Sequence, residues 1–599
     1  MPAALDRLRS VVREVTYPLS LPSAEPARQV ANAIVTQLDS YVFPRLARMD
    51  APLLVVVGGS TGAGKSTLVN SLARARVSAA GVLRPTTRCP VLACNPADIT
   101  WFHSGELLPG LTRVAEASDE PGTMQLVAAP ALEPGLAFLD APDIDAVVDE
   151  NRALATQLLA AADLWLFVTT AARYADAVPW ELLHTARARG TVIALVLNRV
   201  PPEAIDEVSA HFSEMLAAND LANAPLFVVP ESEVDGHGLL PEAATGLLRE
   251  WFDKLAADPS SRGAIVRQTL DGALAALTPA VAGLAEAADD QTAAVTDLRE
   301  RLASAYRGAR QTVERTLDDG RLFRGELFVR WQEFVHAGGL FRALESRVGH
   351  LRDRVVAALT GRPRPERHLQ AALEAQLGTV LRDAATDAAE RAYASWQVHP
   401  AGAELLTPEL ARPSDGVSER ARQVARDWLG DVLDVLRAEA DQRSRGSAYA
   451  SNPIGLTLMV AVIASTPPAV SASLPPDAAA PHSEKETDGE AAGPSAAGDQ
   501  ATTADGTAVA ARVVLEAIFG DQAVRTLISA ARDRLLARVG ALLDEEANRY
   551  LAQLATAGVS DGAPGPADRL RSAVAEVEAA RNAARLTEGT AFTLPGTPS

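Results

Sequence analysis

Cysteine is nearly absent from this chain, which has Cys89 and Cys94 as its only two cysteines among 599 residues. Two thiols without histidine neighbours at metal-ligand spacing exclude a disulfide framework and a cysteine-histidine metal site. This composition favours a reducing, cytoplasmic compartment. The first residues, Met1 to Arg7, also lack the apolar segment of a secretion signal, and we therefore expect none.

Aromatic residues are sparse, at 5% of the chain, and there is no excess of basic residues, because the formal net charge is −20. Alanine, leucine, valine, arginine and glutamate are abundant instead, which favours long helices over a large all-β body. The acidic balance argues against a dedicated nucleic-acid binder, which usually carries a basic excess. Because single hydrophobic cores stop growing at about 250 to 300 residues, we expect several domains.

Lysine is scarce as well, and one of the three lysines, Lys65, completes the most informative motif of the sequence. Residues 59–66 read GSTGAGKS and fit the pattern G-x-x-x-x-G-K-[ST]. The β-branched run Leu53 to Val57 precedes the motif, and helical spacing begins at Ser66. A strand that turns into a helix is the context that a phosphate-binding loop requires.

The chemistry of this loop predicts a nucleotide site. Glycines let the backbone turn its N–H groups inward at a helix N-terminus, where the helix dipole also favours an anion. Lys65 adds a compact charge between the β- and γ-phosphates, where the broad fork of arginine does not fit. The alternative is an ordinary glycine-rich turn. The residues assigned to nucleotide binding here are Gly59, Ser60, Thr61, Gly62, Ala63, Gly64, Lys65, Ser66 and Thr67.

Two further loops follow in the order expected of a GTPase. Residues 83–90 form a polar loop before a strand, which suits a threonine that coordinates Mg²⁺ and senses the γ-phosphate. Thr87 is the first candidate for this threonine and Thr86 is the second. The alternative is that the loop is a plain turn without a role in Mg²⁺ binding. Asp140 ends the apolar run from Ala137, where a carboxylate holds the Mg²⁺ shell through water. Its alternative role is to cap a following turn.

A last loop concerns recognition of the base. Asn198 and Arg199 follow the apolar run from Val192, and ligands bind at the carboxyl ends of the strands in open α/β sheets. The Asn198 amide could therefore meet the base while Arg199 lies over it. An asparagine before Pro201 and Pro202 could equally initiate a turn.

The pattern of the chain predicts an α/β domain followed by a helical body. Two N-terminal helices are expected, over 5–15 and 25–48, and alternating strands and helices indicate a doubly wound, mainly parallel sheet. Beyond Ala264 only helical periodicity remains. The expected strands are Leu53–Val57, Val91–Cys94, Gly135–Leu139, Leu164–Thr169, Val192–Leu197 and Leu226–Val229.

We expect seven segments from these patterns. They are N-terminal helices packing on the bundle (1–50), a P-loop GTPase domain (51–258), a helical stalk (259–450), an uncharged apolar tip (451–475), a disordered acidic linker (476–506), returning helices (507–582) and a flexible tail (583–599).

Two apolar stretches raise the question of membrane contact. Ile454 to Ala464 carries no charge and would be about 17 Å long as a helix, too short to span the roughly 30 Å hydrocarbon core of a bilayer. It could dip into one leaflet or lie in the core of the bundle. The aromatic run from Leu322 to Phe341 could contact lipid too, although helical aromatic spacing is usually core.

The ordered loops, together with the helical architecture, resemble the bacterial dynamin-like GTPases, especially the actinobacterial membrane-remodelling type. The resemblance is carried by 59–66, 84–87, 140–143 and 198–199. It implies a GTPase domain on a helical stalk and Mg²⁺-dependent GTP hydrolysis coupled to self-association and membrane binding or remodelling. The partners implied are GTP, other copies of the chain, and membrane lipid or a related GTPase. The expected location is cytoplasmic, peripheral at the inner face of the cell membrane.

On this interpretation Ser66 and Thr87 ligate Mg²⁺, Asp140 acts through water, and Lys65 with the loop amides holds the phosphate oxygens. The catalytic residues are thus Lys65, Thr87 and Asp140. Candidate charge donors are Arg84, Arg88 and Arg173, each of which could instead be a solvated surface arginine.

The sequence departs from the family pattern at three positions. Asp143 replaces the glycine of DxPG, Pro201 replaces the acid of [NT]KxD, and Gly62 stands where many dynamins carry a serine. These departures bear on hydrolysis rate, guanine selectivity and any monovalent-cation mechanism. We expect weak basal turnover that improves when two GTPase domains meet. The alternatives are a nucleotide-gated scaffold with little hydrolysis, a soluble assembly GTPase and, least favoured, an ABC-type ATPase.

Overall fold

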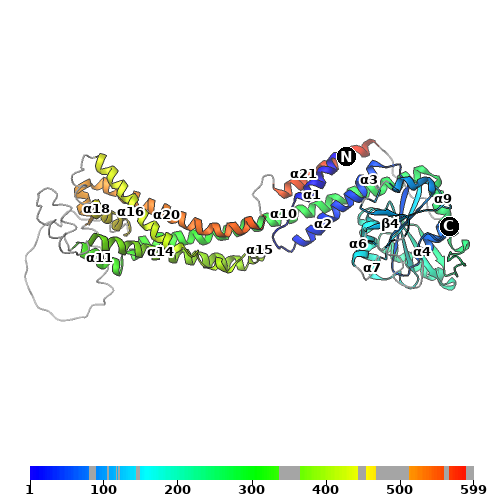
Figure 1. Ribbon diagram of the computed structural model, residues 1–599, viewed down its shortest axis with the longest axis horizontal. Coiled ribbons are helices and arrows are strands. Elements are labelled where there is room, and N and C mark those ends of the chain that lie inside the picture. The colour runs from blue at the N-terminus through cyan, green and yellow to red at the C-terminus, as the bar shows by residue number, and fades with distance from the viewer. Residues whose placement is uncertain are drawn as a thin grey trace, which may run out of the picture. The chain divides into compact units, whose positions relative to one another are not determined.

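The structure of the chain is a computed structural model (Figure 1). It describes all residues except 80–88, 104–106, 109, 117, 119, 121, 144–148, 336–364, 443–452, 467–510, 559–564 and 588–599. The chain divides into two compact units. The first consists of Met1–Tyr17, Pro22–Gln291 and Gly562–Ser599, and the second of Pro18–Leu21 and Thr292–Asp561.

A single eight-stranded sheet forms the centre of the first unit. The strands are β1 Leu53–Gly59, β2 Val91–Cys94, β3 Thr112–Val114, β4 Thr123–Ala128, β5 Leu136–Asp140, β6 Leu164–Thr170, β7 Val192–Val200 and β8 Leu226–Pro230. Their order is β3-β4-β2-β5-β1-β6-β7-β8, and all neighbours run parallel except β2 and β5. This is the doubly wound, mainly parallel sheet that the sequence predicts.

Strand β1 shows why this sheet is covered on both faces. Successive side chains of a strand point to opposite faces. Leu54 and Val56 accordingly pack in one core, while Leu53, Val55 and Val57 pack in the other. All five are at most 4% exposed. A strand that is buried on both faces reads as a continuous apolar run, which is the signal that located it in the sequence.

Helices cover the two faces of the sheet, as the ribbon shows (Figure 1). Those of the sheet region are α4 Lys65–Ala73, α5 Ile99–His103, α6 Asp149–Ala160, α7 Ala177–Ala188, α8 Ile205–Ala218 and α9 Glu242–Ala257. Phe102 and Phe212 belong to one core, and Leu68 and Phe252 to the other.

The N-terminal helices are α1 Pro2–Glu14, α2 Ala24–Gln37 and α3 Phe43–Ala47. The sequence predicts one continuous helix over 25–48, but the structure has a π-helical turn at Leu38–Val42 between α2 and α3. These helices form a core of their own with α21 Pro566–Thr587 and the first part of α10 Pro259–Asp318. Of the described helices, α10 alone is long and apolar enough to cross a membrane, but Leu277 and Val281 on it are at most 1% exposed in this core.

A buried ion pair connects α3 to the sheet. The Arg45 guanidinium pairs with the Asp163 carboxylate, and their side chains are 2% and 0% exposed. Arg45 also donates a hydrogen bond to the Pro52 carbonyl at 3.0 Å, and the Leu54 N–H donates to Asp163 at 2.7 Å. Because buried charges are costly unless paired and hydrogen-bonded, this network fixes the start of β1.

The second unit is entirely helical among its described residues. Besides the last part of α10 its helices are α11 Glu326–Phe334, α14 Pro365–Gln397, α15 Pro400–Ala403, α16 Val417–Gln442, α18 Pro453–Ala464 and α20 Asp521–Thr556. They share one hydrophobic core. Trp396 donates to the Leu298 carbonyl at 3.0 Å and Trp428 to that of Ala531 at 2.7 Å, so these buried indoles also satisfy their polar atoms.

Both apolar stretches of the sequence lie in this core where they are described. Leu322, Trp331 and Phe334 are at most 1% exposed, as expected of core aromatics and aliphatics, while Phe341 lies outside the described residues. In α18, every residue from Leu456 to Ala464 is at most 6% exposed, and the helix packs against α16 and α20. The sequence allowed this segment to dip into one membrane leaflet or to lie in the core of the bundle, and in the structure it lies in the core. Outside residues 454–464, the predicted apolar tip (451–475) is described only at residues 453 and 465–466.

Candidate nucleotide site

The glycine-rich loop lies where the sheet topology places ligand sites. Strand β1 has β5 on one side and β6 on the other, and the chain extends the sheet outward from it in both directions. Ligands bind outside the carboxyl ends of the strands at such a switch point. Helix α4 begins at Lys65 directly behind the loop, and Gly64 precedes it in a left-handed conformation with φ 93°.

Two glycines of the loop are required by close contacts. A Cβ on Gly59 would lie 2.0 Å from the Val168 carbonyl oxygen of β6. A Cβ on Gly64 would lie 2.4 Å from Asn198 Nδ2, in addition to the strain of positive φ. The glycines at 59 and 64 therefore have a steric cause, because the backbone of β6 and the Asn198 side chain of β7 leave no room for a Cβ.

Lys65 is only 5% exposed and is surrounded by oxygen atoms. Its Nζ donates to the carbonyls of Gly59 and Ser60 at 2.9 and 3.2 Å. It also pairs with Asp143 Oδ1 at 2.5 Å. Asp143 stands at the DxPG glycine position, so this departure places a carboxylate against the Lys65 ammonium group.

Asp140 ends β5 beside β1, and its carboxylate is fully buried. Ser78 Oγ donates to Oδ2 at 2.6 Å, while Oδ1 has no hydrogen-bond partner among the described residues. Burial raises the pKa of Asp140, and the nearby hydroxyls of Ser66 and Ser78 oppose that rise. A buried carboxylate oxygen without a partner, next to a serine hydroxyl, fits the oxygen ligands of Mg²⁺.

Asn70 holds Ser78 in position, and no motif in the sequence pointed to Asn70. The Asn70 side chain accepts from Val77 N and Ser78 N at 2.9 and 2.8 Å, and donates to the Ser78 carbonyl at 2.9 Å. Asn70 is 1% exposed. These bonds join residues seven and eight positions apart, so neither spacing nor residue type could have indicated them.

Asn198 in β7 and Arg173 in the turn after β6 both donate hydrogen bonds to the backbone of the loop. Asn198 Nδ2 donates to the Ala63 carbonyl at 2.7 Å, from within β7 at an irregularity between Leu197 and Val200. Arg173 Nη1 donates to the Thr61 carbonyl at 3.0 Å. The structure therefore shows Asn198 supporting the loop backbone.

Arg199 follows Asn198 in a left-handed conformation with φ 53° and is exposed. Its Nε lies 3.9 Å from the point that a Gly64 Cβ would occupy, so its side chain reaches the loop. The structure thus brings Lys65, Asp140 and Asn198 together around the loop. Thr87, Arg84 and Arg88 lie outside the described residues.

Both cysteines are free and buried. Burial raises the pKa of the Cys94 thiol to about 12, which keeps it protonated at neutral pH.

The sequence matches no protein-family model and no curated protein. Among solved structures, two from a study of an oligomerised bacterial dynamin pair that senses and tethers membranes cover 96% and 94% of this chain, and 94% and 96% of their own. They are 10% and 9% identical to it, both with a TM-score of 0.38. Era in complex with MgGDPNP and a piece of 16S ribosomal RNA is 17% identical, with a TM-score of 0.22, over 34% of this chain and 56% of its own.

Proposed function

We propose that this protein is a dynamin-like GTPase that binds and hydrolyses GTP with Mg²⁺ and couples the nucleotide state to self-association at a membrane. The observation that carries the proposal is the P-loop at the central strand, with Lys65 and Asp140 beside it at the carboxyl end of the sheet. In this proposal 51–258 is the nucleotide domain, and 259–450 with 507–582 forms the stalk.

Phosphoryl transfer depends on positioning and charge neutralisation, which the residues of this loop can supply. Lys65 and the loop N–H groups would hold the β- and γ-phosphates. Ser66, Thr87 and Asp140, the last through water, would hold Mg²⁺, whose charge offsets that developing on the phosphates. Thr87 would orient the attacking water. Asn198 would keep the loop in the binding conformation through Ala63.

The first test is nucleotide affinity. Calorimetry with GTP and with ATP, each with Mg²⁺, should give tighter binding for GTP, and Lys65→Ala should abolish it. Lys254→Ala is the matched control, because Lys254 is 66% exposed on α9 and pairs with Glu250. Binding that survives in Lys65→Ala, or a preference for ATP, would contradict the proposal.

A second candidate function is a nucleotide-gated scaffold with negligible hydrolysis. The contact between Lys65 and Asp143 favours it, because a fixed carboxylate near the γ-phosphate position opposes the charge that develops there. Single-turnover hydrolysis separates the two functions. Equal background rates in wild type and Lys65→Ala would establish the scaffold, whereas a lysine-dependent rate supports the GTPase.

Membrane contact is proposed for α18 in a nucleotide-bound assembly at the inner face of the cell membrane. Because α18 is buried, the helix would have to leave the core to reach lipid. Ile454 at its start is 52% exposed, so Ile454→Cys can carry an environment-sensitive dye without disturbing the core. The native cysteines are buried and would not be labelled.

Addition of anionic vesicles and a non-hydrolysable GTP analogue should shift the emission of this dye to the blue. Val398→Cys carrying the same dye is the control, since Val398 is 77% exposed and lies outside α18. An unchanged spectrum at position 454 in protein that sediments with the vesicles would show that another segment contacts lipid.

A further inference from the structure

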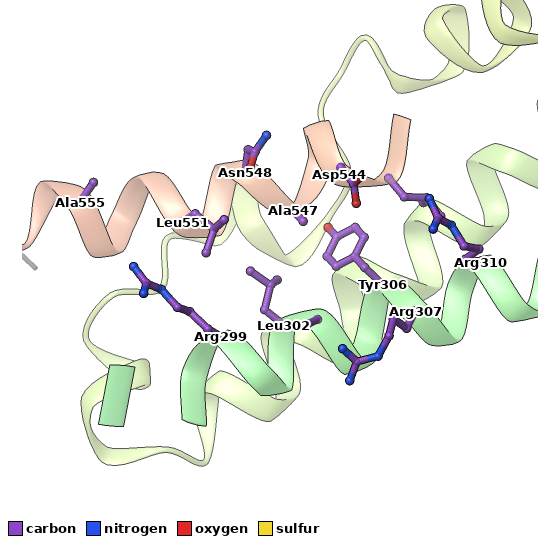
Figure 2. Close-up of a pocket in the computed structure, with 12 residues that line it drawn as sticks. Arg299, Leu302, Tyr306, Arg307, Arg310, Asp544, Ala547, Asn548, Leu551 and Ala555 are labelled. Atoms are coloured by element: carbon purple, nitrogen blue, oxygen red, sulfur yellow. The ribbon is translucent and has the colours of Figure 1, made fainter. Parts of the chain in front are cut away.

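A groove in the second unit lies between α10 and α20 (Figure 2), whereas the P-loop belongs to the first unit. Its volume is about 650 Å³, within the range of roughly 300 to 1,000 Å³ that is usual for small-molecule sites. The part of α10 that lines it runs from Arg299 to Arg310, about 16 Å at 1.5 Å per residue. The groove is therefore elongated along the helices.

One buried polar atom in this groove lacks a partner. Tyr306 is 5% exposed, and its hydroxyl has no hydrogen-bond partner among the described residues. Figure 2 shows the ring of Tyr306 directed from α10 toward α20. Burial raises the pKa of Tyr306 above its ordinary value, so the hydroxyl remains a neutral donor. Since a buried hydroxyl without a partner is unfavourable, the site gains when a ligand accepts this hydrogen bond.

The charges around Tyr306 favour an anion. Arg299, Arg307 and Arg310 line the groove against a single acidic residue, Asp544. Among the described residues, neither Arg307 nor Arg310 has an ion pair or hydrogen bond. The Arg310 guanidinium lies against Gly540 of α20, where an added Cβ would be 1.5 Å from Nη2. A local positive site of this kind contrasts with the acidic chain as a whole.

Apart from Asn548 of α20, the remaining wall of the groove is apolar. It is formed by Leu302 from α10 and by Leu543, Ala547 and Leu551 from α20. Inorganic phosphate would leave this wall uncovered, and a pure hydrocarbon would leave the arginines and the hydroxyl without partners. Only a ligand with both chemistries uses the whole groove.

We infer that this groove binds an amphiphilic anion, a single phosphate or carboxylate headgroup on a hydrocarbon chain, with Tyr306, Arg307 and Arg310 at the headgroup. Such a ligand could come from a free amphiphile or from a membrane lipid. The site is separate from the nucleotide loop, and the inference does not depend on the proposed GTPase function.

The test is calorimetric titration of the full chain with decyl phosphate below its critical micelle concentration. Wild type should bind it saturably at one site, with inorganic phosphate and decanol each much weaker. Arg310→Met should lose about tenfold in affinity, since a hydrogen bond to a charged group is lost. Arg315→Met, an exposed arginine of α10 outside the groove, should be unchanged.

Tyr306→Phe separates a ligand role from a structural one. It should weaken decyl phosphate binding by about tenfold, yet raise the melting temperature of the ligand-free protein, because it removes a buried unpartnered hydroxyl. A lowered melting temperature with unchanged affinity would overturn the inference, as would equal or non-saturable binding by all variants.

Vesicles distinguish the sources of the ligand. Binding to phosphatidic acid vesicles, but not to phosphatidylcholine vesicles, that is lost in Arg310→Met assigns the site to a membrane lipid. Decyl phosphate binding without vesicle binding assigns it to a free amphiphile.

Discussion

At the scale of single residues, Lys65 is the centre of the candidate site. The carbonyls of Gly59 and Ser60 and the carboxylate of Asp143 surround its ammonium group. The two carbonyls keep the side chain folded over the loop. A triphosphate bound at this loop would have to compete with the Asp143 carboxylate for the Lys65 ammonium group, so Asp143 would lower its affinity.

Asp143→Gly should therefore tighten triphosphate binding. Asp143 is 19% exposed, so the charge-assisted contact is only partly screened, and its loss should strengthen affinity about tenfold. Calorimetry with a non-hydrolysable GTP analogue and Mg²⁺ measures this. Asp220→Ala, which removes an exposed ion pair with Arg187, is the control. Weaker binding by Asp143→Gly would show that the carboxylate assists the ligand.

Gly64→Ala should abolish nucleotide binding and destabilise the first unit by about 1 to 3 kcal/mol, since positive φ and the clash with Asn198 both strain the loop. Gly246→Ala is a matched control. It lies within α9, with nothing within 4 Å of the added Cβ, and should stabilise by roughly 0.5 to 1 kcal/mol. Thermal melts and calorimetry give both readouts. Intact binding by Gly64→Ala would contradict the loop geometry.

The P-loop could be predicted because its residues are consecutive and each has a known role toward phosphate. Asp140 could be predicted because it ends a recognisable buried strand. The contact of Asp143 with Lys65 could not, because the two are 78 residues apart and meet only through strand pairing. The hydrogen bond from the Asn198 amide to the Ala63 carbonyl could not be predicted either, because the two residues are 135 positions apart in the sequence.

At the scale of elements, six strands could be predicted and two could not. All six are apolar runs; five are buried on both faces, and the edge strand β8 alternates between buried and partly exposed residues. Strand β3 has only three residues, Thr112–Val114, of which Thr112 is exposed, and β4 is polar at Thr123 and Gln125. Short, partly exposed strands near a sheet edge carry no such signal. The helix predicted over 25–48 is helical from Ala24 to Ala47, and only its π-helical turn at Leu38–Val42 was missed, because apolar spacing continues through that turn.

Glu546 connects α20 to neighbouring segments and should make the second unit sensitive to acid. Its carboxylate is 1% exposed, accepts from Ser414 N at 2.9 Å and pairs with Arg549 at 3.1 Å and with Arg420. Burial raises the pKa of Glu546, but the hydrogen bonds of Ser414 and Arg549 outweigh it, and the net pKa is lowered.

A lowered carboxyl pKa favours the ionised form in the folded state, so its stabilisation is complete above the unfolded value of about 4.3 and is lost as pH falls through the folded pKa. Glu546→Gln should therefore be less stable than wild type at neutral pH, and the difference should shrink below about pH 4. Denaturant titrations of the two proteins across this range measure it. A difference that does not vary with pH would contradict the assignment.

At the scale of the whole molecule, the two units have separate hydrophobic cores. A ligand that binds only the folded nucleotide domain adds about 2.7 kcal/mol of stability at a hundredfold excess over its Kd. Differential scanning calorimetry with a GTP analogue and Mg²⁺ should therefore move one unfolding transition upward and leave the other in place. Lys65→Ala should cancel the shift. A single transition, or equal movement of two, would show that the units unfold together.

Helix α18 has apolar residues on every side and no polar side to turn toward water. A helix of this kind has no favourable position at partial exposure, because any rotation or tilt out of the core brings hydrocarbon into contact with solvent. Departure of α18 from the bundle would therefore be all-or-none. A signal that releases it must exceed a threshold, and below that threshold the helix stays where it is.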